Sequence, residues 1–230
     1  MVMRVKLKIA NAWKAVRRIF IRPGGTYVRV RRVFEKVNGV WQFKWRDDRW
    51  QIWAMGSDCT THSISNRGLN LNNKAFMSPG RSWNLLTLDQ NGTAVEAFSF
   101  DIYGEYQSEI SGEIVRMYDK LQSLPNGQLF CLYSWDEPKY GSDGRGFNGV
   151  MIRDLQSAVY RVGGTPSRYN KNYLQFRGAY ILLSKVGVST IYEEYVGAYV
   201  SDTAGDPAAS IVIRFNVREN DVFEFSVALG

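Results

Sequence analysis

The stretch GQLFCLYSWDEP, residues 127–138, decides the fold of this chain. Within it, Leu129 to Tyr133 form an apolar run without the alternating polar positions of a half-exposed strand. Because neighbouring side chains of a strand point to opposite faces, such a run is typical of a strand that is buried on both faces. We therefore expect a central strand here, which ends at an aromatic residue and two carboxylates, Trp135 to Glu137.

Helical and extended patterns flank this strand and predict an α+β protein. Apolar residues recur at helical spacing in two segments, Ile110, Ile114, Met117, Tyr118 and Leu121, and then Met151, Leu155, Ala158, Val159 and Val162. Ser111 is a candidate N-cap of the first helix, and Gly163-Gly164 would end the second. Further strands are predicted at 82–89, 94–102, 174–185 and 192–200, followed by a hairpin over 211–227.

Positive charge is concentrated at the N-terminus. Residues 1–50 hold 14 Lys/Arg against 3 Asp/Glu, a net of +11, whereas residues 51–230 hold 15 against 19, a net of −4. Such a segment would contact an acidic protein, nucleic acid or an anionic membrane, or it would protect an exposed strand face from edge pairing. No apolar run of membrane-spanning length occurs, so we expect no membrane insertion. Cys59 and Cys131 are expected to be free thiols.

The basic segment also carries a 14-residue repeat. WKAVRRIFIRPGGT (13–26) aligns with YVRVRRVFEKVNGV (27–40), and Trp41 begins a third copy. Gly24-Gly25 and Asn38-Gly39 are hairpin signals, so two short strands are expected in each unit. A β repeat of this size needs a partner to cover one face, and the rest of the chain or another subunit would supply it. The same surface would extend through Trp50, Ile52 and Trp53.

These patterns divide the chain into three parts. We expect a basic aromatic β-repeat over 1–50, an α+β domain over 51–200, and a C-terminal hairpin over 201–230 that completes the sheet or pairs with a partner.

The α+β part resembles a known family in short sequence motifs at the ends of its predicted elements. The matching pieces are GRSWNL (80–85), NG (91–92), FDIY (100–103), GQL (127–129), YSWDEP (133–138), the GG pair (163–164), FRGAY (176–180) and KVG (185–187). Over about 58–200 the chain is similar to the interleukin-like EMT-inducer domain, also called the GG domain. The resemblance implies antiparallel β-sheets packed against two helices. The N-terminal β repeat is an extension that this family does not have. The repeat itself resembles segments of bacteriophage tail and tail-fibre-associated proteins.

The sequence offers little for catalysis. His62 is the only histidine, and Cys59 with His62 makes half of a zinc spacing without a second pair. Asp136 and Glu137 are neighbours, whose side chains diverge on a strand or tight turn, which is poor geometry for a glycosidase pair. We expect no catalytic residue, metal or cofactor, and hence no enzyme.

Two binding surfaces are predicted instead. Docking on a partner subunit is assigned to Trp13, Arg17, Arg18, Phe20, Tyr27, Arg31, Arg32, Phe34 and Trp41. A glycan site would combine an aromatic face with groups that bind hydroxyls, and the candidates are Asp101, Tyr103, Trp135, Asp136 and Arg177. In the alternative interpretation, Asp101 and Arg177 form an internal ion pair and Trp135 caps the core.

The sequence thus predicts a structural virion protein of a bacteriophage tail, made in the host cytoplasm, which connects a baseplate or tail with a tail fibre. Its partners would be other tail proteins in a homo- or hetero-oligomeric assembly. The alternative is a carbohydrate-binding module for a host cell-surface glycan. Arg17-Arg18 and Arg31-Arg32 interleave with aromatic residues and would also suit nucleic acid. No recognised nucleic-acid module accompanies them, so a protein partner is favoured.

Overall fold

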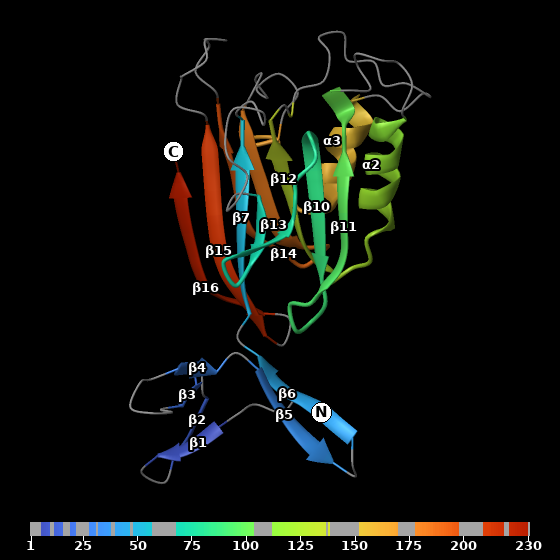
Figure 1. The fold of residues 1–230 in the computed structure, drawn as a ribbon. Coiled ribbons are helices and arrows are strands. Elements are labelled where there is room, and N and C mark those ends of the chain that lie inside the picture. The colour runs from blue at the N-terminus through green and yellow to red at the C-terminus, as the bar shows by residue number, and fades with distance from the viewer. Residues whose placement is uncertain are drawn as a thin grey trace.

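The structure is a computed structural model. It describes residues 6–9, 12–15, 19–21, 28–30, 32–37, 40–46, 48–56, 68–103, 112–136, 138, 152–169, 178–197, 209–218 and 221–229. In the strands before residue 47, the description covers the backbone alone. Elements carry the labels of Figure 1.

Strand β12 (Leu129–Trp135) lies inside the largest sheet, and every one of its residues is buried. It pairs antiparallel with β10 (Ser82–Leu88) on one side and with β13 (Ala179–Lys185) on the other. The apolar run over 129–133 therefore forms a central strand, as predicted.

The ten-stranded sheet around β12 consists of two antiparallel arms (Figure 1). One arm has the order β11–β10–β12–β13–β14 and adds β11 (Ala94–Phe100) and β14 (Ser189–Val196). The other has the order β9–β8–β7–β15–β16, with β7 (Arg49–Met55), β8 (Leu69–Leu71), β9 (Lys74–Met77), β15 (Ser210–Arg218) and β16 (Asp221–Leu229). The arms join where Trp135 pairs in parallel with Met55, so the sheet is mixed.

Helices α2 (Glu113–Ser123) and α3 (Ile152–Arg161) turn the described apolar residues of the predicted spacing into one hydrophobic cluster. The first predicted residue of each face, Ile110 and Met151, lies outside the described residues. The N-cap of α2 is Gly112 at φ 65°, and not Ser111 as expected, because glycine enters the left-handed region without a Cβ clash. After α3, the amide of Gly164 donates to the carbonyl of Val159 at 2.9 Å, so the predicted glycine pair does follow the helix end.

Two hydrophobic clusters cover the two faces of β12. Between the arms, Leu129 and Cys131 pack in one cluster with Ile52 of β7. On the other face, Phe130 and Leu132 belong to a cluster that includes the buried residues of α2 and α3. Figure 1 places both helices on this side of the sheet. The described chain is therefore mostly β-sheet with two helices packed on it, a coarse α+β architecture.

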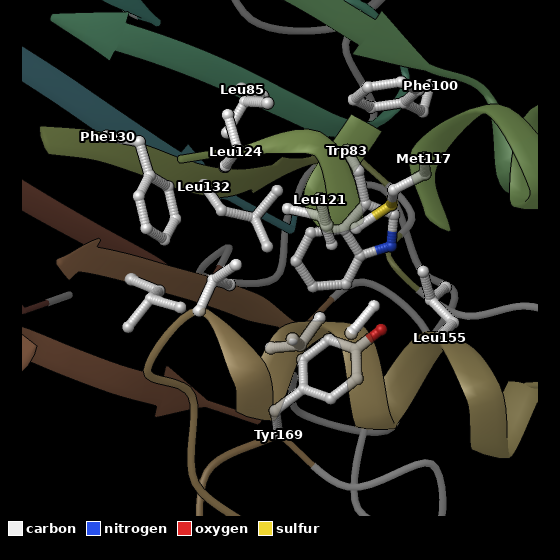
Figure 2. Packing of buried hydrophobic residues seen from close by; sticks show 14 of the residues in the cluster. Trp83, Leu85, Phe100, Met117, Leu121, Leu124, Phe130, Leu132, Leu155 and Tyr169 are labelled. Carbon is white, nitrogen blue, oxygen red and sulfur yellow. The ribbon is translucent and has the colours of Figure 1, made fainter. Parts of the chain in front are cut away.

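Trp83 of β10 lies at the centre of the helix-side cluster and is fully buried. Its ring centroid is 5.5 Å from that of Tyr169 and 5.4 Å from that of Tyr180. Figure 2 shows the indole between Met117 of α2 and Tyr169. The indole nitrogen donates to the carbonyl of Pro138 at 3.2 Å, so the polar atom of this side chain is also satisfied.

The prediction that Trp50 and Ile52 extend the aromatic surface of the repeat is wrong. They are 1% and 0% exposed and belong to the cluster between the arms, not to the aromatic surface of the repeat. The reason is that β15 pairs antiparallel along all of β7, so β7 becomes an inner strand of the second arm. The same pairing makes β15 and β16 the last two strands of that arm.

Candidate functional site

The basic N-terminal segment forms three β-hairpins. Their strands are β1 (Lys6–Ile9) with β2 (Ala12–Ala15), β3 (Ile19–Ile21) with β4 (Val28–Val30), and β5 (Arg32–Val37) with β6 (Val40–Arg46). Among the described strands, each hairpin pairs only within itself and none pairs with the ten-stranded sheet. Two-stranded ribbons of this length are marginal in water, so these hairpins need a covering surface.

The three hairpins share one register. Equivalent cross-strand partners are Leu7 and Lys14, then Ile21 and Val28, then Glu35 and Gln42, each set shifted by 14 residues from the one before. The repeat therefore has three structural copies, one hairpin each. Two short strands lie mainly within each of the units 13–26 and 27–40, as expected, and Val37 pairs with Val40 on either side of the predicted Asn38-Gly39 turn. The paired strands come from neighbouring units, because each hairpin crosses a unit boundary.

The predicted docking residues divide into two groups. Trp13, Phe20, Arg32, Phe34 and Trp41 lie on the described strands β2, β3, β5 and β6. Arg32 is the register partner of Arg46 at the open end of the third hairpin. The others, Arg17, Arg18, Tyr27 and Arg31, lie outside the described residues.

The four described members of the predicted glycan set, Asp101, Tyr103, Trp135 and Asp136, lie near one end of the large sheet. Arg81, which the sequence interpretation did not assign to the site, lies there too. Arg81 donates from Nε and Nη2 to the two carboxylate oxygens of Asp101, at 2.8 and 2.7 Å. Its guanidinium carbon also lies 5.2 Å from the ring centroid of Tyr103. The hydrogen bond to Asp101, followed by the charges of Asp101 and Asp136, raises the pKa of Arg81.

Arg81 could have been found from the sequence. The Asn91-Gly92 turn closes a hairpin in which Trp83 pairs with Phe100, so the residues just before Trp83 lie opposite those just after Phe100. Arg81 and Asp101 face each other at this open end. Because their side chains are 36% and 44% exposed, the pair contributes at most about 1 kcal/mol to stability.

Of the remaining members of the predicted glycan set, Trp135 is buried, Asp136 is partly exposed and Arg177 is not described. Trp135 is 2% exposed, so its ring offers no open face to a sugar. It is buried because Ser82 of β10 and Met55 of β7 flank it in the sheet. Asp136 is partly exposed, at φ 65°, with its amide donating to the Met55 carbonyl at 2.8 Å. Arg177 lies outside the described residues, as does its proposed ion pair with Asp101.

Two titratable side chains of the described residues, Cys131 and Tyr180, are fully buried in the core. Burial raises the pKa of the Cys131 thiol well above its ordinary value, and the same cause raises the pKa of Tyr180. The Tyr180 hydroxyl donates to Glu193 at 2.7 Å. Within the described ranges, no group of three or more His, Cys, Asp or Glu side chains could hold a metal ion. None of the described helices is long and apolar enough to cross a membrane.

The raised pKa of Cys131 predicts a loss of stability in alkali. The unfolded thiol ionises above about pH 8.5, while the buried thiol stays protonated. The contribution of this thiol to the stability of the folded state is therefore fully present below that pH and is lost as the pH rises. The free energy of unfolding should fall by about 1.4 kcal/mol per pH unit for this group. Between pH 9 and pH 10, the free energy of unfolding measured with denaturant should therefore decrease less in Cys131→Ala than in the unchanged protein. An equal decrease with pH in the two proteins would contradict the prediction.

Fold and site together define an α+β protein with a mixed sheet, two helices and a basic segment of three equivalent hairpins. Comparison with protein-family models and with curated proteins gave no match.

Proposed function

We propose that the chain is a non-enzymatic structural protein of a bacteriophage tail, made in the host cytoplasm and incorporated into the virion. Its N-terminal hairpins dock on another tail subunit. Its α+β domain, with the fold of the interleukin-like EMT-inducer family, connects the baseplate or tail with a tail fibre.

One observation carries the proposal: the three hairpins repeat a single register and, among the described strands, pair with nothing else. Segments of this kind gain stability by covering one face with a partner. The net charge of +11 over residues 1–50 favours a partner surface that is acidic. The resemblance of the repeat to tail-associated segments directs the proposal to a phage tail, and the lack of an activated nucleophile in the sequence supports a structural role.

Incorporation into particles tests the proposal. Tail particles lacking this protein would be supplied either with the full chain or with a chain that starts at residue 47. We expect the full chain in the purified particles by mass spectrometry, and we expect the shortened chain to be folded but absent from them. Phe76→Ala, which alters an exposed side chain of β9, is the matched control and should be incorporated normally. Equal incorporation of the shortened chain would refute docking through the hairpins.

A host glycan is the second candidate partner. The observation that favours it is the partly exposed cluster of Arg81, Asp101 and Tyr103, which combines hydrogen-bonding groups with an aromatic ring. Since Trp135 is buried, Tyr103→Ala is the informative change on a glycan array. Binding that is lost in Tyr103→Ala and kept in Phe76→Ala would favour a carbohydrate-binding module. Absence of binding by the unchanged chain would exclude the glycans tested.

A further inference from the structure

The shared register places a basic residue directly opposite an aromatic residue in the hairpins. Lys8 is the register partner of Trp13 in β1–β2, and Lys36 is the partner of Trp41 in β5–β6. The 14-residue period gives Arg22 and Tyr27 the equivalent sequence positions in the middle copy, where they lie outside the described residues. The basic–aromatic pair is therefore a repeated property of the segment.

These pairs define one face of each hairpin, here called the basic–aromatic face. Residues two positions apart on a strand share a face, so the face also includes the next register pair in each hairpin. Its described members are Lys6, Lys8, Trp13 and Ala15, then Phe20 and Arg29, then Phe34, Lys36, Trp41 and Phe43. Arg32 is two positions from Phe34, so Arg32 and its register partner Arg46, beyond the register shift of the third hairpin, complete this face.

Charge separates this face from the opposite one. The basic–aromatic face carries six cations and no carboxylate among these described positions. The opposite face has the register pairs Leu7–Lys14, Ile9–Ala12, Ile19–Val30, Ile21–Val28, Val33–Trp45, Glu35–Gln42 and Val37–Val40. Its single lysine and single glutamate cancel, so the positive charge in these pairs belongs to the basic–aromatic face.

The composition of this face identifies the chemistry of its partner. Its described positions hold five aromatic residues beside six cations. A single-stranded nucleic acid can also pair its phosphates with cations and stack its bases on aromatic rings, but no recognised nucleic-acid module accompanies these positions in the sequence. Aromatic residues combined with cations are typical of the energetic centres of protein–protein interfaces. An acidic protein surface that also exposes apolar or aromatic side chains complements both properties.

We propose that the basic–aromatic face binds an acidic protein surface through three equivalent contacts, one for each hairpin. The proposal rests on the proposed docking function and names the partner's chemistry. Each contact places a carboxylate of the partner at the cation and an apolar group at the neighbouring aromatic position. Because the three contacts belong to one segment, the second and third form at high effective concentration and the affinity rises with each copy.

The test uses the full chain and a fluorescent random copolymer of glutamate and tyrosine as the acidic aromatic probe, with binding followed by fluorescence anisotropy. We expect binding that weakens with added salt. Lys8→Gln and Lys36→Gln should each weaken binding about tenfold, and the double variant about a hundredfold. Lys14→Gln is the matched control, because it removes the same charge from the opposite face, and it should change binding less than about twofold. Circular dichroism of each variant checks that the fold is kept.

Three results would overturn the proposal. Equal losses in Lys8→Gln and Lys14→Gln would mean that net charge alone binds the probe. Tighter binding of a single-stranded DNA of equal charge would assign the face to a polyanion, and absence of copolymer binding would exclude an acidic partner. Incorporation of the Lys8→Gln and Lys36→Gln double variant into tail particles separates this proposal from the docking function. Normal incorporation contradicts the inference alone, whereas copolymer binding by a chain that never enters particles contradicts the docking function alone.

Discussion

Replacement of Trp83 by alanine is expected to lower the free energy of unfolding by about 3–5 kcal/mol. The indole is fully buried and contacts the rings of Tyr169 and Tyr180, so its removal leaves a cavity between the sheet and the helices. It also leaves the carbonyl of Pro138 without its indole donor. Urea unfolding followed by circular dichroism gives the midpoint and the slope from which the change is calculated.

The matched control for Trp83 is Val95→Ala on the neighbouring strand β11. Val95 is 58% exposed, so its truncation should change stability by less than about 0.5 kcal/mol. If both variants lost similar amounts, Trp83 would not be the centre of the core that Figure 2 displays.

The second large effect is a difference in stability between two N-terminal deletions that differ by four residues. A chain that starts at residue 47 should keep the stability of the ten-stranded sheet, whereas a chain that starts at residue 51 should lose at least about 3 kcal/mol. The difference arises from Asp48 and Trp50, which are 5% and 1% exposed. The Trp50 indole donates to the carbonyl of Gly92 at 2.9 Å, and the Asp48 carbonyl accepts from Asn216 at 3.1 Å.

Thermal unfolding of both shortened chains measures this difference. Trp50→Ala in the full chain is the control, and it should reproduce most of the loss without any deletion. Equal stability of the two shortened chains would mean that the first residues of β7 contribute nothing to the second arm. The comparison also defines where the repeat ends, because β7 begins at Arg49, inside the segment that composition alone assigns to the repeat.

The elements of the larger domain were mostly predictable because their signals are local. The predicted Asn91-Gly92 turn lies between β10 and β11. The predicted glycine pair Gly163-Gly164 follows the end of α3. The N-cap of α2 was not predictable from residue preference, because Ser111 is a better capping type than Gly112. Backbone conformation at the entry to the helix decided that position.

The candidate sites depend more strongly on non-local pairing. The sequence identifies Trp135, an aromatic residue at a strand end, as a candidate sugar-binding ring. Whether its side chain is exposed depends on which strands pair beside it. Met55, 80 residues earlier in the chain, pairs with it in parallel and helps to bury it. The partner of Asp101 is Arg81, whose position follows from hairpin register rather than from residue type.

The sequence by itself determined that β12 is buried on both faces and that the basic segment repeats every 14 residues, because strand alternation and repeat period are properties of consecutive residues. Only the tertiary structure decided what covers each face of β12, namely two helices on one side and the second arm on the other. It also decided that Trp50 belongs to the core and that each hairpin crosses the boundary of a repeat unit. Strand pairing joins residues that are distant in sequence, and a periodic pattern has no intrinsic starting point.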